Sequence, residues 1–196
     1  MLTRALLSAR HMSRARVSIR RLHDYADSEA VFGAVRACLQ PLGGMEAFVK
    51  PGQKVLLKVN TVTPLPPERM ATTHPAMVRA VAQLALDAGG RVAVGDSPGI
   101  GDPAKVLETC GIMAVIREMN LELADFKNTA SFECAENRMA RKLDLAKAVA
   151  DADVIITIPK PKTHVQMTYT GAVKNQFGLI PGTRKAQYHY RLETRE

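Results

Sequence analysis

The stretch "DVIITIPKPKTH", residues 153–164, decides the fold, because an apolar run passes directly into a basic one. Residues 153–159 are rich in branched aliphatic side chains and end at a proline, which predicts a buried β-strand. The prolines stop strand pairing, so we expect the basic residues to follow the carboxyl end of that strand. Lys160 and Lys162 would point to the same side of an extended segment. Two such ammonium groups repel each other unless an anion lies between them, although solvation of both is the ordinary fate of lysine.

Other segments alternate between the patterns of strands and helices. Strands are predicted at residues 16–22, 54–60 and 91–97. Apolar residues at helical spacing predict helices at 27–44, 75–88, 103–118 and 143–152, whereas residues 121–140 show no clear pattern. This alternation indicates an α/β fold with a mainly parallel sheet, flanked by helices in three layers.

Two of these helices carry recognisable starts. Ser28 is a suitable N-cap for the first helix, and Gly43 and Gly44 follow its end. Pro75 fits the first position of the next helix, because its missing N–H would be unpaired there in any case.

The basic charge of the chain is concentrated at its N-terminus. The chain has 196 residues and a formal charge of +8, and residues 1–21 hold six arginines and no acidic residue. The remaining residues have 21 basic and 19 acidic side chains, so we expect no nucleic-acid-binding face. Residues 1–13 are either a transit peptide or an upstream start before Met12, and we expect a disordered extension. Residues 14–196 then form one domain, and because the chain stops inside an apparent element we expect that domain to be incomplete.

The cysteines and apolar runs bear on the cellular compartment. Cys38, Cys110 and Cys134 are scattered and form no CxxC pair, which fits a reducing interior. No apolar run approaches the roughly 20 residues that cross a bilayer. The heavy use of Ala and Arg is typical of a GC-rich bacterial genome. We therefore expect a bacterial, cytoplasmic protein without a membrane partner.

Polar clusters follow several predicted strands. In open parallel sheets ligands bind in the crevice outside the carboxyl ends of the strands, so these clusters are expected to converge. The candidate residues are Lys58, Asn60, Asp96, Ser97, Lys160, Lys162 and His164, with Thr72, Thr73 and His74 at a helix start and Lys174 and Asn175 on a short helix in "TGAVKNQFG".

Each cluster has an alternative without function. "GDSPG" around Asp96 is a turn by composition, or else a carboxylate beside an anion-binding loop. "TTHP" at 72–75 is a helix start, or else a set of donors for an anion. A lysine whose pKa is lowered could act as a base or Schiff-base nucleophile. His164 could carry protons, bind phosphate or hold a metal, although a lone histidine is more often structural.

Six blocks in order resemble one family. They are "KVLLKVN", "ATTHPAMVRAV", "AGGRVAVGDSPG", "DADVIITIPKPKTH", "TGAVKNQFGLIPG" and "KAQYHYRL". Together, from about Val17 onward, they resemble the landmarks of the DUF362 family, a family defined by sequence with no settled activity. The resemblance implies that the motif positions are the twelve polar residues named above, without assigning their roles. Val59 departs from the family, which usually has proline at that position.

The resemblance also bears on cofactors. Many members resemble ferredoxin-linked proteins, in which a cysteine-rich module for two [4Fe–4S] clusters follows the domain. This chain has no such cysteines and resembles the N-terminal half of the family domain. We therefore expect no cofactor in this chain, and [4Fe–4S] clusters only in a longer form.

The leading functional hypothesis is a domain that binds a small anionic ligand, carrying a phosphate or carboxylate, and that forms part of a redox-linked enzyme. His164, Lys162 and Asp96 are the catalytic candidates. One alternative is a metal-dependent enzyme that uses His74, His164 and Asp96. Another is a non-catalytic electron-transfer or assembly module that docks a second copy or a missing C-terminal half. The ligand-binding candidates are Lys58, Asn60, Thr72, Thr73, His74, Ser97, Lys160, Lys174 and Asn175.

Overall fold

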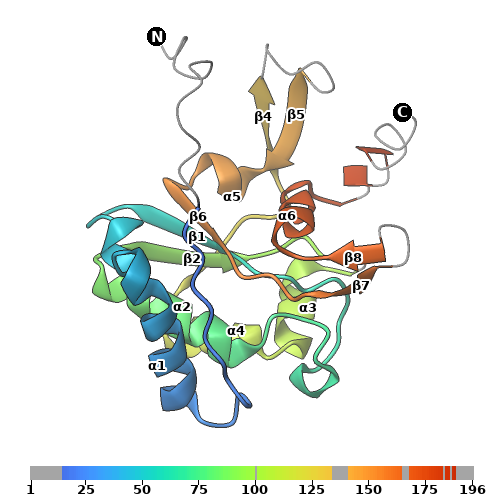
Figure 1. The fold of residues 1–196 in the computed structure, drawn as a ribbon. Coiled ribbons are helices and arrows are strands. Elements are labelled where there is room, and N and C mark those ends of the chain that lie inside the picture. Colours follow the sequence, from blue (N-terminus) through green and yellow to red (C-terminus); the bar gives the residue numbers. More distant parts are fainter. Residues whose placement is uncertain are drawn as a thin grey trace.

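The computed structural model describes residues 15–99, 101–133, 141–164, 168–182, 184–185 and 187–188. Its centre is a four-stranded parallel sheet with the strand order β3-β2-β1-β6 (Figure 1). The strands are β1 (Lys54–Lys58), β2 (Arg91–Gly95), β3 (Glu122–Leu123) and β6 (Val154–Thr157). The α/β fold with a parallel sheet is thus confirmed.

The register of the sheet brings the polar clusters to one edge. Lys58 at the end of β1 lies opposite Gly95 of β2 and Thr157 of β6. All three strands run in the same direction, so the residues that follow them emerge together. The strands are shorter than predicted, since β1 ends at Lys58, β2 at Gly95 and β6 at Thr157.

One face of the sheet is covered by four helices, which are α1 (Ser28–Leu39), α2 (Pro75–Asp87), α3 (Pro103–Thr109) and α4 (Ile112–Glu118). They bury the larger core, to which β1 contributes Val55 and Leu57. Short 3-10 helices join this layer at η1 (Gln40–Leu42), η2 (Met45–Ala47) and η3 (Pro67–Arg69). Pro75 begins α2 as predicted. The N-cap of α1 is Asp27 rather than Ser28, because the Asp27 carboxylate accepts hydrogen bonds from the Glu29 and Ala30 amides.

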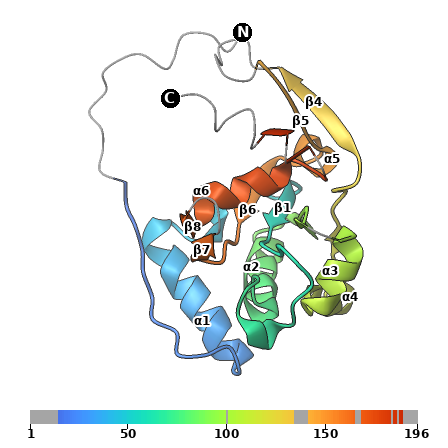
Figure 2. The ribbon, with the colours of Figure 1, turned by 90° about the vertical axis from the view of Figure 1, so that its right-hand side faces the viewer.

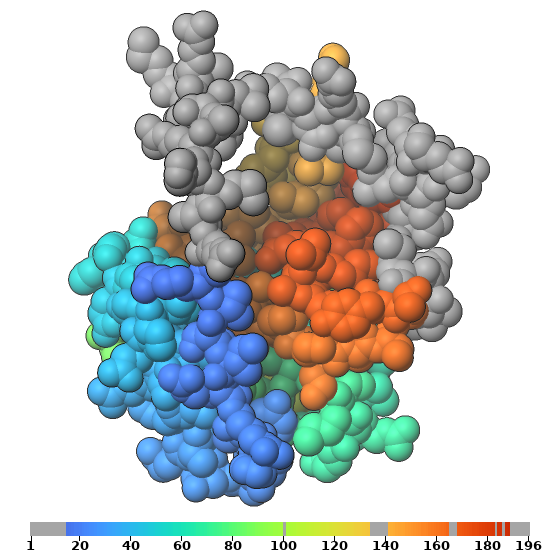
Figure 3. Space-filling model, in the orientation of Figure 1, coloured from blue at the N-terminus to red at the C-terminus, as the bar shows by residue number. Residues whose placement is uncertain are grey.

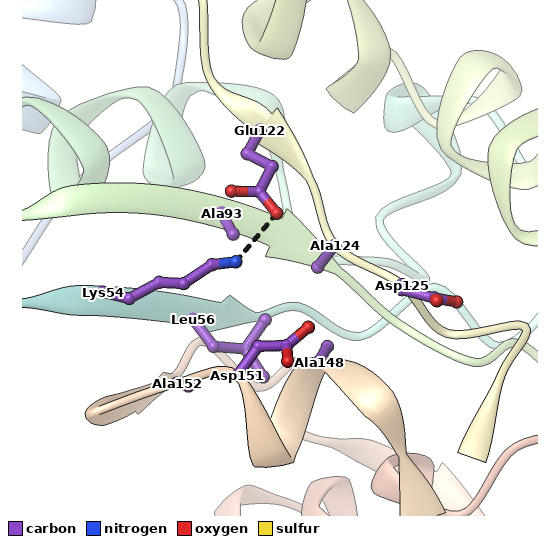
Figure 4. A pocket seen from close by; sticks show the side chains of 9 residues that line it. All are labelled: Lys54, Leu56, Ala93, Glu122, Ala124, Asp125, Ala148, Asp151 and Ala152. Carbon is purple, nitrogen blue, oxygen red and sulfur yellow. Dashed lines mark hydrogen bonds and ion pairs between the residues drawn. The ribbon is translucent and has the colours of Figure 1, made fainter. Parts of the chain in front are cut away.

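The opposite face is covered by less of the chain. The short helix α5 (Lys147–Ala150) packs there over Leu56 and Ala93 in a smaller core. Figure 4 shows the small gap between this helix and the sheet, where Lys54 is paired with Glu122 at 3.0 Å. The gap has a volume of about 10 Å³, room for one water at most, so it is no ligand site.

Residues 143–152 were predicted as one helix, and this prediction is wrong. Residues Lys142–Ala146 form strand β5, which pairs antiparallel with β4 (Thr129–Glu133), and only then does α5 begin. The hairpin projects from the body at the end away from α1 and α2 (Figure 2). Within residues 121–140, for which the sequence shows no clear pattern, the described part holds only the short strands β3 and β4.

The strand predicted at residues 16–22 is also absent. Residues 15–22 have neither helix nor strand in the structure. The alternation of Val17 and Ile19 predicts a strand, but their side chains are 78% and 80% exposed. Strand pairing here would therefore bury little apolar surface. The extension predicted at residues 1–13 and Cys134 lie outside the described residues.

The last described segments return to the sheet edge. They are the hairpin of β7 (Lys162–His164) and β8 (Thr168–Thr170), the helix α6 (Ala172–Asn175) and the 3-10 helix η4 (Gln176–Leu179). Figure 3 shows these orange and red segments beside the blue N-terminal ones on one face of the molecule. No helix in the described part of the chain is long and apolar enough to span a membrane.

Candidate functional site

A cavity of about 440 Å³ lies at the carboxyl ends of the parallel strands. Loops after β1 and β2 form one side, and β7, β8, α6 and η4 form the other. The lining residues with charged or polar side chains are Asn60, Asp96, Ser97, Lys162, Thr163, His164, Thr170, Lys174, Asn175 and Lys185.

A buried ion pair forms part of the base of this cavity. Lys58 is fully buried, and its Nζ lies 2.6 Å from Asp96 Oδ1. The same ammonium donates to the carbonyl oxygen of Val59 at 2.7 Å and to Asn175 Oδ1 at 3.2 Å. Lys58 is therefore held by two hydrogen bonds beside the ion pair. Burial lowers the pKa of Lys58, while the charge of Asp96 opposes that shift.

Asp96 is held from its other oxygen as well. Asp96 Oδ2 accepts hydrogen bonds from the Thr61 backbone N–H at 2.8 Å and from Thr61 Oγ1 at 2.9 Å. A buried carboxylate needs such partners, because an unpaired buried charge is strongly unfavourable.

Gly178 allows η4 to pack directly on the ion pair. A Cβ at this position would lie 2.7 Å from both Asp96 Oδ1 and Lys58 Nζ. A Cβ atom does not approach other heavy atoms this closely, so any larger residue would displace the pair. The sequence interpretation gave Gly178 only the role of ending a helix.

Asn175 connects β1, β6 and α6. Its side-chain N–H groups donate to Thr157 Oγ1 at 2.7 Å and to the Lys58 carbonyl at 3.3 Å. Its Oδ1 accepts from Lys58 and, at 3.1 Å, from Asn60 Nδ2. These bonds satisfy the whole amide and fix its orientation.

Lys162 is hydrogen-bonded to the segment that follows β1. Its Nζ donates to Asn60 Oδ1 at 2.7 Å and to the Ala71 carbonyl, and the residue lines the cavity. The side chain is half-buried, and burial lowers its pKa, with Asp96 opposing and Lys160 adding to the shift. Of the lysines with hydrogen-bonded ammonium groups here, Lys162 is the one best placed to contact a ligand.

Lys185, the first residue of the block "KAQYHYRL", lines the cavity, although it is not among the predicted site residues. Its Nζ donates to the Ser97 carbonyl, to Ser97 Oγ at 3.0 Å and to the Pro98 carbonyl at 3.0 Å. It therefore ties the C-terminal segment to the loop after β2. Burial lowers the pKa of Lys185 to about 8.

His164 and Lys174 also line the cavity. Burial lowers the pKa of His164, and the charges of Lys174 and Lys162 lower it further. The Lys174 ammonium lies 4.4 Å from the centre of the Phe177 ring, in a cation–π contact. Burial lowers the pKa of Lys174 too.

The "TTHP" residues are placed differently from those above. Thr73 Oγ1 accepts from the Asn60 amide and donates to the Ile158 carbonyl at 2.5 Å, so it joins two strand ends. Thr72 is buried, and neither threonine lines the cavity. His74 Nδ1 accepts from the Ala76 amide and its ring stacks on Tyr25 at 4.2 Å. Lys160 is half-buried and does not line the cavity. Burial lowers the pKa of the His74 imidazole, and the charge of Lys160 lowers it further.

The metal-dependent alternative does not fit this geometry. Among the described residues, no group of three or more His, Cys, Asp or Glu side chains is arranged to hold a metal ion. His74, His164 and Asp96 therefore do not come together as the two-histidine, one-carboxylate set. His74 is instead the cap of α2, and Asp96 is the partner of Lys58.

Comparisons with known proteins agree with the sequence resemblance. Residues 55–195 match the family described as "Domain of unknown function (DUF362)". The "Thylakoid-associated protein sll1697" of Synechocystis sp. is 40% identical over 173 residues, which cover 88% of this chain and 53% of that protein. The chain thus spans about half the length of this curated relative. No solved structure matches the chain significantly. The family match covers well over half of the chain, and the chain therefore belongs to the DUF362 family.

Proposed function

We propose that this domain binds a small anionic ligand, carrying a phosphate or carboxylate group, in the cavity at the carboxyl ends of the parallel strands. The observation that carries the proposal is the balance of charge at the cavity. Three lysines line it, Lys162, Lys174 and Lys185, against a single carboxylate. That carboxylate, Asp96, is already paired with Lys58 beneath it.

The lowered pKa values of these lysines support the same ligand charge. Burial lowers the pKa of Lys162, Lys174 and Lys185, which means that their charged forms are poorly solvated. A bound anion would favour the charged forms and relieve this cost. Part of the binding free energy would therefore come from the ammonium groups of these lysines, whose charged forms are disfavoured by burial when no ligand is bound.

The residues also suggest a division of roles. Lys162 would contact the anion through its ammonium group, and His164 would transfer protons on the same side of the cavity. Asp96 would keep Lys58 and the Thr61 backbone in place, so its contribution would be to position rather than to react. A redox-linked reaction would need [4Fe–4S] clusters, which we expect only in a longer form of the protein.

Calorimetric titration with sodium sulfate, at constant ionic strength against sodium chloride, tests the proposal. We expect sulfate to bind, and Lys162→Gln to weaken its binding about tenfold or more, as expected for a lost charge-assisted hydrogen bond. Lys105→Gln is the matched control, because Lys105 is exposed on α3 away from the cavity. No sulfate binding, or equal losses in the two variants, would contradict an anion site at Lys162.

A second candidate function is assembly, which the β4–β5 hairpin favours. Ala130 and Phe132 of β4 lie opposite Leu145 and Leu143 of β5, so one face of the hairpin is apolar. The other face is polar, with Ser131 donating to Asp144 at 2.5 Å. These four side chains are only partly buried, and we propose that another chain covers them in the assembly.

We also propose a cellular compartment for the protein. The scattered cysteines favour the cytoplasm. The relative's name refers to thylakoids, whereas none of the helices in the described part of this chain is long and apolar enough to span a bilayer.

A further inference from the structure

We infer that the ligand is an organic anion, with its acidic group at Lys162 and an apolar body against Val62 and Phe177. This inference rests on the proposed function, because it assigns the class of ligand to the same cavity. It adds that an inorganic oxyanion fills only a part of the site.

The size of the cavity is the first observation. A water molecule takes about 30 Å³ of liquid, and a five-atom oxyanion takes roughly two or three times as much. The cavity of about 440 Å³ is several times larger than that. It lies in the range of pockets that enclose whole organic molecules, roughly 300–1,000 Å³.

The second observation is that the cavity has an apolar side. Val62 and Phe177 line it together with Gly99 and Gly178, which bring backbone rather than side chains to the wall. Val62 is 43% exposed, although most of the large aliphatic side chains of the sheet and its helices are buried. Pockets that join apolar walls to a few charged groups are typical of sites for organic ligands.

The backbone of Val62 is the third observation. Val62 has φ = 31°, a left-handed conformation that is a true outlier for a β-branched residue. The Val62 carbonyl accepts a hydrogen bond from the Gly99 amide at 2.8 Å, which holds the residue in this conformation. Strained backbone of this kind is concentrated at ligand-binding and active sites. Asparagine or glycine would adopt this conformation with less strain. The chain has a valine here instead, and its exposed side chain lines the cavity.

Paired titrations with inorganic phosphate and phenyl phosphate test the inference. We expect phenyl phosphate to bind about tenfold tighter or more, because its ring would bury apolar surface on Val62 and Phe177. Val62→Asn should reduce the ratio of the two affinities, because it removes one of the two apolar side chains that would contact the ring. The same variant should unfold at an equal or higher temperature than the wild type, because asparagine tolerates a left-handed backbone.

The control is Val17→Asn, which makes the same change at a valine that is 78% exposed and does not line the cavity. It should keep the full preference for phenyl phosphate. Equal binding of the two phosphates by the wild type would overturn the inference and leave the anion site standing. Equal loss of both ligands in Val62→Asn would also overturn it, because the role of Val62 would then be structural. If neither phosphate binds, and sulfate does not bind either, the anion site itself fails.

Discussion

At the scale of single residues, Gly178 is the position where a small change should have the largest effect. An added methyl group would lie 2.7 Å from both members of the buried ion pair, which cannot move without losing their other hydrogen bonds. We expect Gly178→Ala to lower the free energy of unfolding by about 1–3 kcal/mol, as for other overpacked sites. Gly33→Ala should instead raise it by up to about 1 kcal/mol, because Gly33 is in α1 with no atom within 4 Å of the new methyl group.

Urea unfolding of the two variants beside the wild type measures this difference. The same small gain for both substitutions would mean that η4 does not pack on the ion pair as described. The comparison uses one chemical change at two positions, so general effects of alanine on the unfolded chain cancel.

Several residues of the site were predictable because they follow strands. Lys58, Asn60, Asp96 and Lys162 come directly after apolar runs, and the rule for parallel sheets brings such residues together. Lys185 follows no strand, and its position at the start of the block "KAQYHYRL" does not place it at the sheet. Gly178 is an ordinary helix end in sequence, and only the packing of η4 on Lys58 shows that its missing side chain matters.

At the scale of elements, the β4–β5 hairpin should contribute little to the stability of the isolated chain. Its apolar face belongs to neither core, and α5 is the main described element that packs against it. We expect Phe132→Ala to cost less than about 1 kcal/mol of unfolding free energy. Phe126→Ala should cost about 3–5 kcal/mol, because Phe126 is buried and packs against Gly95.

Thermal unfolding of both variants at several protein concentrations separates the possible roles of the hairpin. A concentration-dependent loss in Phe132→Ala would favour the assembly function, because the face would then be covered by another copy. A loss as large as that of Phe126→Ala at every concentration would show that the face is packed within one chain.

The same hairpin shows why element prediction failed locally. In "LDLAKAVADA" the apolar residues Leu143 and Leu145 alternate as in a strand, and the alanines and valine that follow have helical spacing. A window that averages the two reads as one helix, and the partner strand β4 is 13 residues away at the Ser131–Asp144 pair. Strands β1, β2 and β6 were easier to predict because each is a compact run rich in branched residues, as is typical of buried parallel strands. The two-residue parallel strand β3 is exposed and was not predicted.

At the scale of the whole molecule, the lysines of the cavity should give the domain an unusual dependence of stability on pH. The pKa of Lys185 is about 8 in the fold, against 10.5 as its ordinary value. Between these two values the unfolded chain binds more protons than the folded one, so the free energy of unfolding rises with pH. The pKa values of Lys58, Lys162 and Lys174 are lowered as well, and each adds to the same slope.

Urea unfolding at a series of pH values from about 7.5 to 10 measures this slope, and Lys185→Met isolates the part due to one residue. Burial lowers the pKa of Lys185, Asp96 opposes this shift, and Lys58 and Lys174 add to it. Lys185→Met removes only the Lys185 amine, so a change in the pH dependence of unfolding free energy can be assigned to that group. We expect a flatter profile in Lys185→Met and an unchanged one in Lys105→Met, whose side chain is exposed. Sulfate should flatten the wild-type profile as well, because a bound anion holds the lysines protonated and its own charge is constant over this range. Identical slopes in the wild type and Lys185→Met would mean that Lys185 keeps its ordinary pKa, and the cavity would then present a solvated rather than a desolvated ammonium group to its ligand.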